Sequence, residues 1–193
     1  MQTVIPPSLA HIDFNTGVIA DAAEVVVRRL SDMPDFFGDQ NAVRELLKVD
    51  PVLYRVYNAY QPGEAGGLYT GTTIIEPGRV GDEYFMTKGH FHTQQGAPEV
   101  YLTLGGNGML VMQTRSGETV VQPMLAGSLH YIPGRWAHRT VNTGDVPLIF
   151  FAAWPVSAGH DYDSVARDGL ARLVLSGPNG PRVVSNPHYT QPR

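Results

Sequence analysis

The sequence predicts an all-β protein, and three observations lead to this fold class. Its 21 glycines and 15 prolines divide the chain into many short segments, because both residues interrupt regular structure. The best helix patterns are short and lie near the N-terminus. From residue 52 onward, strand-like segments follow one another at short intervals. This spacing is typical of a small antiparallel sandwich or barrel.

Two short helices are expected before the strands, at residues 22–30 and 41–48. Asp39 or Asn41 would cap the second helix, because short polar side chains accept hydrogen bonds from the free N–H groups of a first turn. The pair Asp50-Pro51 marks its end, since a residue that precedes proline disfavours helical geometry.

The expected strands continue to the end of the barrel and are separated by glycine-containing turns. Two of these turns, 105–108 and 115–118, are expected to close hairpins, because glycine adopts the positive φ that tight turns require. A short helix at 165–170 and a final hairpin around 177–180 should follow. The expected strands are 53–60, 69–75, 83–87, 99–104, 108–114, 119–123, 129–132, 138–142, 148–153, 171–175 and 182–185.

The composition is that of one folded domain. The chain has 193 residues, of which 42% are hydrophobic and 17% charged, and no linker divides it, so we expect a single domain over 1–193 with a barrel core at about 52–155 and terminal extensions packed on it. The net charge of −4 favours a small-molecule ligand and argues against nucleic acid or an acidic membrane surface.

The compartment is inferred from what the sequence lacks. Because there is no cysteine, disulfides and cysteine-based catalysis are excluded. No apolar run approaches the ~20 residues that cross a bilayer. Residues 1–7 show no basic stretch followed by an apolar core, so we expect no signal peptide and a cytoplasmic location.

The most informative feature is a set of three histidines and one glutamate. His90 and His92 are two residues apart, so in a strand both side chains would project from the same face. A hairpin partner beginning at Glu99 would supply a carboxylate, and His138, which opens another strand, would supply a fourth ligand. An isolated His-x-His pair is usually structural, but four such groups on strand-like segments predict a metal site.

Nitrogen and oxygen ligands without a thiolate favour one first-row divalent ion per subunit. Fe(II) is favoured, while Mn(II), Ni(II), Co(II) and Zn(II) stay open. An octahedral ion with these four ligands would keep two positions for water or a chelating substrate, whereas tetrahedral zinc would be closed and structural.

These residues resemble the two sequence motifs of the cupins. Two departures stand out, since the gap between His92 and Glu99 is longer than usual and Arg135 occupies a position that normally holds glycine. Both departures are similar to features of the cupin-type glucose-6-phosphate isomerases found mainly in archaea. The resemblance covers nearly the whole chain. It is carried by His90, His92, Glu99 and Gly106, by Gly127, Pro133, His138 and Asn142, and by the segments 27–33, 87–92, 136–142 and 158–162.

The resemblance implies a cupin barrel, that is, a double-stranded β-helix, in a metal-containing homodimer. It implies the reversible conversion of glucose 6-phosphate to fructose 6-phosphate, a step shared by glycolysis and gluconeogenesis, with His90, His92, Glu99 and His138 as metal ligands. A metal with two free positions could bind the oxygens at C1 and C2. Glu99 would carry a proton between C2 and C1 in an ene-diol route, while a hydride shift would need no base. The sequence leaves both routes open.

Substrate contacts are also carried over from the resemblance. Strict strand alternation from His90 would direct Lys88 inward and Thr87 outward, so a contact by Thr87 requires a bulge, for which Gly89 is the candidate. Lys88 is kept as a further phosphate partner. Trp154 replaces an expected tyrosine and is not included. The expected substrate-binding residues are Thr73, Thr87, Lys88, Gly89, Tyr101, His160 and Tyr162.

Other residues and functions stay open at this point. Tyr54 is as consistent with a packed strand aromatic as with a ligand contact, and Arg28 and Arg29 are most simply solvated charges or dimer contacts. A cupin metal site also serves oxygenases, which would consume oxygen with Fe(II). A non-catalytic cupin would bind a phosphosugar without turnover, and Glu99 argues mildly against that alternative.

Overall fold

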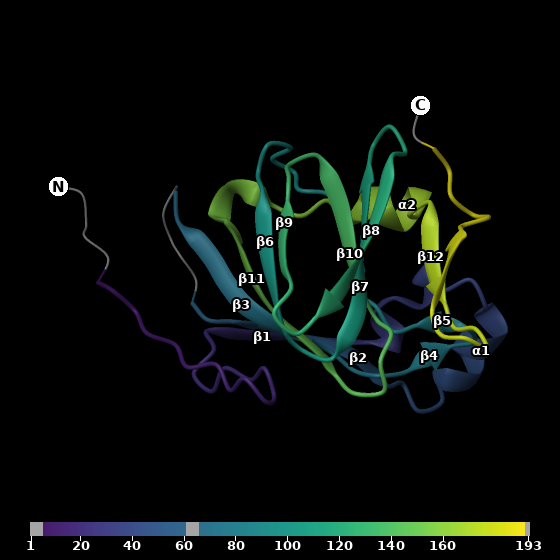
Figure 1. Cartoon of the computed structure of the whole chain (residues 1–193), viewed down its shortest axis with the longest axis horizontal. Coiled ribbons are helices and arrows are strands. Elements are labelled where there is room, and N and C mark those ends of the chain that lie inside the picture. Colours follow the sequence, from purple (N-terminus) through teal and green to yellow (C-terminus); the bar gives the residue numbers. More distant parts are fainter. Residues whose placement is uncertain (1–5, 61–65, 192–193) are drawn as a thin grey trace.

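The computed structural model describes residues 6–60 and 66–191, and the chain in this part is predominantly β (Figure 1). Residues 1–5, on which the expectation about a signal peptide partly rests, lie outside it. In the described residues no helix is long and apolar enough to cross a membrane. The helices are α1 (Gln40–Leu46) and α2 (Tyr162–Asp168), with 3-10 turns at Leu30–Asp32, Pro34–Phe36 and Val156–Ala158. The strands are β1 (Glu24–Arg29), β2 (Val52–Asn58), β3 (Leu68–Ile75), β4 (Arg79–Val80), β5 (Glu83–Tyr84), β6 (Glu99–Gly105), β7 (Asn107–Thr114), β8 (Thr119–Leu125), β9 (Leu129–Ile132), β10 (Trp136–Asn142), β11 (Leu148–Pro155), β12 (Arg172–Leu175) and β13 (Arg182–Ser185).

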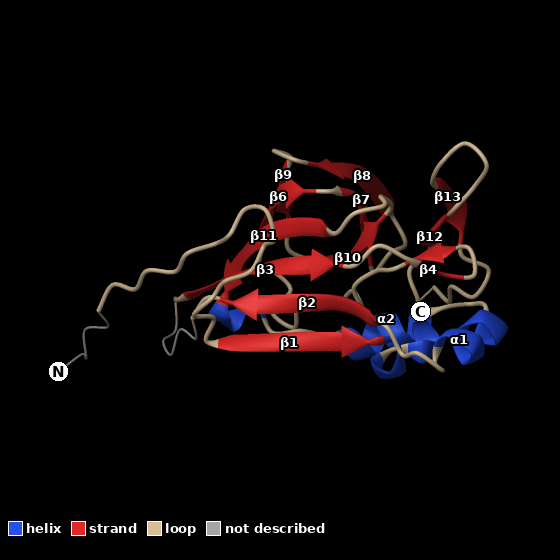
Figure 2. Cartoon of the chain, turned by 90° about the horizontal axis from the view of Figure 1, so that it is seen from below, coloured by secondary structure: helices blue, strands red, loops and turns tan. Residues whose placement is uncertain are grey.

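Antiparallel sheets build the fold. A six-stranded sheet has the order β1-β2-β3-β11-β6-β9, a three-stranded sheet the order β10-β7-β8, and a smaller sheet the order β13-β12-β5-β4. Figure 2 shows β1, β2 and β3 side by side, with α1 and α2 gathered at one end of these strands. The core includes Leu53 and Ile75 from one sheet and Leu110 and Met124 from another, all fully buried. Burying such side chains stabilises the fold by roughly 1.5–3 kcal/mol each.

The prediction of a helix at 22–30 is wrong, because residues of this segment form the strand β1. Three consecutive valines, Val25 to Val27, are stiff at χ1 and favour strands over helices. β1 pairs antiparallel with β2, from Glu24 opposite Asn58 to Arg28 opposite Tyr54. Long-range pairing with β2 therefore decides the conformation. As a consequence, alternate side chains of β1 face the interior.

The other helices agree with the sequence. The helix expected at 41–48 is confirmed as α1, and the Asp39 carboxylate caps it by accepting hydrogen bonds from the N–H groups of Asn41 and Ala42, both at 3.0 Å. The helix expected at 165–170 begins earlier, as α2, because the Asp161 side chain accepts a hydrogen bond from the Ser164 N–H at 3.1 Å.

Most expected strands are present, with two differences. The strand expected at 83–87 is shortened to β5, and Met86 makes only an isolated bridge to Val141. The turn at 105–108 does not close a hairpin, because β6 pairs with β9 and β11 while β7 pairs with β8 and β10. Gly106 allows the crossing between sheets: it has φ +77°, and a Cβ there would lie 2.4 Å from the Pro147 carbonyl oxygen. The other expected hairpins, β7–β8 and β12–β13, are confirmed.

A buried amide joins the two main sheets. Asn142, at the end of β10, is 0% exposed. Its amide nitrogen donates to the carbonyl oxygen of Ile75, the last residue of β3, at 2.9 Å and to that of Val146 at 3.0 Å. Its side-chain oxygen accepts from the Gly144 N–H at 2.9 Å. Asn142 thus bonds three backbone groups, of which the Ile75 carbonyl is in a buried contact and the other two are in partly buried contacts.

We predict that Asn142→Ala lowers the free energy of unfolding by about 2–4 kcal/mol, because one buried and two partly buried hydrogen bonds to the backbone are lost. Chemical denaturation would measure the loss. Thr143→Ala is the matched control, since the Thr143 hydroxyl makes only a 3.4 Å contact with the Asn107 carbonyl oxygen, and it should cost less than about 1 kcal/mol. Equal losses in the two variants would show that Asn142 does not act as this link.

Candidate metal centre and adjoining cavity

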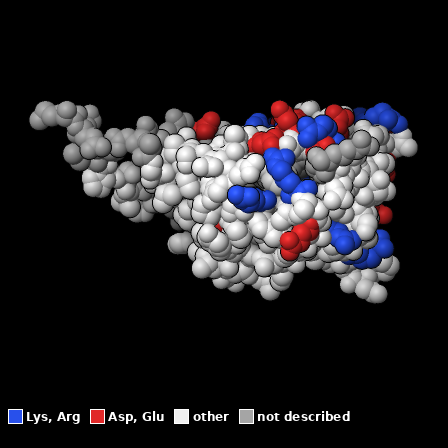
Figure 3. Space-filling model, turned by 90° about the horizontal axis from the view of Figure 1, so that it is seen from above, with Lys and Arg blue, Asp and Glu red and all other residues white. Residues whose placement is uncertain are grey.

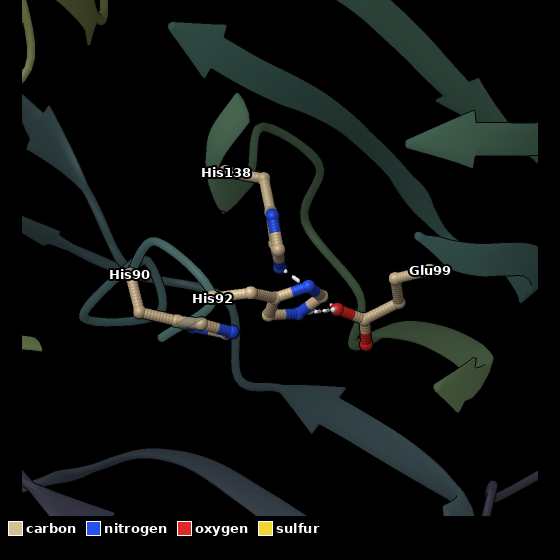
Figure 4. Close-up of side chains that lie close together, drawn as sticks. All are labelled: His90, His92, Glu99 and His138. Carbon is tan, nitrogen blue, oxygen red and sulfur yellow. Dashed lines mark hydrogen bonds and ion pairs between the residues drawn. The ribbon is translucent and has the colours of Figure 1, made fainter. Parts of the chain in front are cut away.

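The four residues of the sequence-derived quartet converge in the interior of the barrel (Figure 4). His90 and His138 form an isolated antiparallel bridge, in which each backbone N–H donates to the other residue's carbonyl oxygen, at 3.2 and 3.1 Å. This bridge places their rings edge to face with centroids 4.4 Å apart. Glu99 is the first residue of β6 and is buried, as are His92 and His138.

One carboxylate oxygen of Glu99 lies close to two of the histidines. The Oε2 atom of Glu99 is 3.1 Å from Nε2 of His92 and 2.9 Å from Nε2 of His138. One ligand atom from each of the four residues lies within 4.8 Å of the others. Metal–ligand bonds of about 2.0–2.2 Å allow neighbouring ligand atoms to be ~3–4 Å apart, so these positions are close to those of a shared ion.

The expected hairpin between the histidine pair and Glu99 is wrong. The segment containing His90 and His92 makes only isolated bridges, to His138 and to Asp161, whereas β6 pairs with β9 and β11. The Glu99 carboxylate reaches the histidines across the barrel interior instead. The proximity of the four side chains is as the sequence predicts, but it comes from the packing of two sheets.

The hydrogen bonds of the histidines indicate that a cation fits among them. Nδ1 of His92 lies 2.9 Å from the carbonyl oxygen of Ala97, which accepts only if this nitrogen carries the proton. In the neutral ring, the Nε2 lone pair would then face the Glu99 carboxylate, a repulsive contact. In the described residues, Nε2 of His90 is buried without a hydrogen-bond partner, and Nε2 of His138 is buried with only the Glu99 carboxylate oxygen beside it, at 2.9 Å. A divalent ion would satisfy these atoms, and three imidazoles with one carboxylate suit such an ion.

The protonation states of His90 and Glu99 are those that metal binding requires. Burial, reinforced by the neighbouring histidines, lowers the pKa of His90 well below its usual value. Burial alone would raise the pKa of Glu99, but the charges and hydrogen bonds of His138 and His92 outweigh it and lower the pKa to about 2. At neutral pH the His90 ring is therefore neutral and Glu99 is ionised, and these are the forms that bind metals.

A cavity of about 240 Å³ adjoins the quartet and is lined by His90, Glu99 and His138. The structure brings every expected substrate-binding residue to its wall. These residues are Thr73, Thr87, Lys88, Gly89, Tyr101, His160 and Tyr162.

The expected alternation of Thr87 and Lys88 does not apply, because residues 87–89 form no strand, and no bulge is needed for both side chains to line the cavity. Gly89 has φ +72°. The buried Arg139 guanidinium donates to the Lys88 carbonyl oxygen from Nη2 at 2.7 Å and from Nε at 3.2 Å. In a trans peptide the C=O and the following N–H point in opposite directions. The N–H of Gly89 is therefore directed away from Arg139.

Sequence reasoning missed several residues of this cavity. Arg28 was interpreted as a solvated charge, but it lines the wall, as does Tyr54 on the neighbouring strand. The error follows from the predicted helix at 22–30, and the alternation of half-buried and exposed residues along β1 shows which side chains face inward. Trp154 also lines the cavity, with its ring centroid 6.2 Å from that of His160. The lining residues outside the expected substrate-binding set and the quartet are Glu24, Val26, Arg28, Tyr54, Val56, Asn58, Phe150, Ala152 and Trp154, of which Tyr54 was left open by the sequence.

Comparison with known proteins identifies relatives over nearly the whole chain. The family model for glucose-6-phosphate isomerase matches residues 27–191. The glucose-6-phosphate isomerase of Pyrococcus abyssi is 47% identical over 184 residues, which cover 95% of this chain and 97% of that protein. The one from Thermococcus kodakarensis is 46% identical over 180 residues, covering 93% and 95%. A structure of oxalate decarboxylase from Bacillus subtilis aligns over 55% of this chain and 26% of that one, with 21% identity and a TM-score of 0.45.

We predict that Gly89→Ala destabilises the fold by about 1–3 kcal/mol. Its φ of +72° disfavours a side chain, and a Cβ would lie 3.0 Å from both the His138 carbonyl oxygen and Cβ of Arg139. Gly96→Ala is the matched control, because nothing lies within 4 Å of a Cβ there. Thermal and chemical unfolding of both variants would test this, and an unchanged Gly89→Ala protein would contradict the assigned backbone geometry.

Proposed function

This chain belongs to the cupin-type glucose-6-phosphate isomerase family, and from this premise we propose that it interconverts glucose 6-phosphate and fructose 6-phosphate with one bound divalent metal ion. The observation that carries the proposal is the quartet of His90, His92, Glu99 and His138 beside a cavity rich in hydrogen-bond donors. Fe(II) is the favoured ion, and the homodimer and cytoplasmic location remain predictions from the sequence.

The reaction moves hydrogen between C1 and C2 of the open-chain sugar. A divalent ion on the quartet would polarise the carbonyl and hold the neighbouring hydroxyl oxygen. One ligand atom from each of the three imidazoles and one from the Glu99 carboxylate lie within 4.8 Å of one another, and Glu99 lines the cavity wall. In the ene-diol route, a Glu99 oxygen would accept the proton from C2 and return it to C1.

The pKa of Glu99 bears on the choice of route. A value lowered to about 2 keeps the carboxylate ionised, as both a ligand and a base require, but it also makes Glu99 a weak base. A hydride shift would leave Glu99 as a ligand only. Burial and the Glu99 charge raise the pKa of Tyr101 well above its usual value, so the phenol stays protonated and can donate to a substrate oxygen.

The phosphate group would bind farther along the same cavity. Thr73 and Thr87 offer hydroxyls there, Lys88 offers an ammonium group, and His160 and Tyr162 close the wall. The N–H of Gly89, directed away from Arg139, adds a backbone donor. Hydroxyl, ammonium and backbone N–H groups are the donors that anion sites use.

We predict that the purified protein isomerises glucose 6-phosphate without oxygen and that His138→Ala abolishes most of this activity by removing a ligand. Its metal affinity should fall at least ~100-fold. The matched control is His130→Ala, which replaces a buried histidine bonded to the Pro123 carbonyl oxygen outside the quartet, and it should keep its metal.

Metal analysis and a coupled assay under anaerobic conditions would measure both properties. Full activity in metal-free His138→Ala protein would contradict the metal site. Oxygen consumption with Fe(II) and no isomerisation would indicate an oxygenase, and phosphosugar binding without turnover would indicate a non-catalytic cupin.

Glu99→Gln separates the roles of ligand and base, because an amide can offer one oxygen to an ion but cannot carry the proton. With full metal occupancy, we predict a loss of at least ~100-fold in kcat, the usual scale of a lost general base. Solvent deuterium should also enter C1 or C2 during turnover by the unmodified protein. Near-normal kcat together with unlabelled product would instead favour the hydride shift.

A further inference from the structure

The proposed substrate carries a dianionic phosphate, so the charges that face the cavity matter. Among the described lining residues, the basic side chains are Arg28 and Lys88, and the acidic ones are Glu24 and Glu99. Figure 3 shows Lys and Arg side chains interspersed with Asp and Glu over part of the face that it draws. Arg28 and Lys88 are therefore the groups to consider as local cations for a phosphate in the cavity.

The alternation of side chains along β1 places the Arg28 side chain on the face that lines the cavity. Along β1, Val26 and Arg28 are half-buried while Val25, Val27 and Arg29 are exposed, as expected for an edge strand with one covered face. Arg28 lies opposite Tyr54 of β2.

Arg29, the next residue along β1, lies on the opposite face of the strand and already has hydrogen-bond partners there. Nη1 of Arg29 donates to the Asp50 carbonyl oxygen at 2.8 Å, and the Arg29 N–H donates to the Asp32 carboxylate at 2.8 Å. The two adjacent arginines thus have opposite orientations and different partners.

No carboxylate neutralises Arg28 within the described part of the chain, where the ion pairs involve Lys48, Arg55, Arg115 and Arg167 or the histidines of the quartet. Glu24 lies four residues away on the same strand, roughly 13 Å along it. Its Oε2 atom accepts a hydrogen bond from the Asn58 amide at 2.9 Å. Glu99 is held between His92 and His138.

A second cation strengthens the positive field at this end of the cavity. The Lys88 ammonium lies 5.9 Å from the centroid of the Phe36 ring. Arg28 and Lys88 line the same cavity, so an anion bound there would relieve the repulsion between these two like charges.

We propose that Arg28 binds the phosphate group of the substrate and, together with Lys88, makes the cavity selective for phosphorylated over free sugars. This inference rests on the proposed isomerase function. The planar guanidinium can donate two parallel hydrogen bonds to phosphate oxygens, which a lysine cannot do. The edge strand β1 therefore supplies a binding residue in addition to the donors of Thr73, Thr87 and Gly89.

Arg28→Gln and Arg29→Gln form a matched pair with equal changes in net charge. In the metal-loaded enzyme, Arg28→Gln should raise the KM for glucose 6-phosphate about 10- to 100-fold and change kcat less than about 3-fold, because the contact is lost equally from ground and transition states. Arg29→Gln should change KM less than about 2-fold. Arg28→Lys should recover part of the affinity. Normal metal content and an unchanged melting temperature would show that the Arg28 variants are folded.

A binding measurement decides the proposal independently of turnover. Calorimetric titration of the metal-loaded protein with 6-phosphogluconate should give a dissociation constant that Arg28→Gln weakens at least about 10-fold, while gluconate binding stays the same in both proteins. Equal effects of Arg28→Gln and Arg29→Gln, or an equal loss for gluconate, would overturn the role of Arg28. An unmodified protein that binds 6-phosphogluconate but does not isomerise would instead refute the proposed activity and leave the phosphate site supported.

Discussion

The structure depends on a buried carboxylate held between two imidazoles. Glu99 is 4% exposed, and its oxygen lies about 3 Å from the Nε2 atoms of His92 and His138. An ionised group in such a place is costly unless opposite charge or hydrogen bonds compensate it. Because the buried Nε2 of His90 also lacks a partner in the described part, a shared cation accounts for all four groups together.

The barrel holds this group through contacts that are mostly made by the backbone. The bridge between His90 and His138 fixes two ligands relative to each other, and the Arg139 guanidinium holds the peptide before Gly89 just ahead of the pair. Asn142 ties β10 to the end of β3, so the sheet that carries His138 cannot separate from the sheet that carries Glu99 without losing buried hydrogen bonds. The backbone bridge, the Arg139 hydrogen bonds and the Asn142 link therefore all hold the residues around the quartet and the adjoining cavity in place.

Most strand positions along the chain and the whole quartet could be predicted from the sequence, because glycine and proline mark turns and because the spacing of His90 and His92 indicates a shared face. Long-range pairing could not be predicted. The segment 22–30 is a strand because β2 lies beside it, and residues 105–108 cross between sheets although their glycines suggest a hairpin. Arg28 was missed for the same reason, since its inward direction exists only once β1 has formed. The substrate residues came from family resemblance, and the structure gathers them around one cavity.

The central claim is that the quartet holds one divalent ion in the folded chain. The most direct measurement is a calorimetric titration of chelator-treated, metal-free protein with Co²⁺ or Mn²⁺, combined with melting temperatures at each ion concentration. If the quartet holds the ion, we expect saturation at one ion per chain, release of protons on binding, and a melting temperature that rises with the concentration of free ion. Absence of saturable binding, or binding that leaves the melting temperature unchanged, would contradict it.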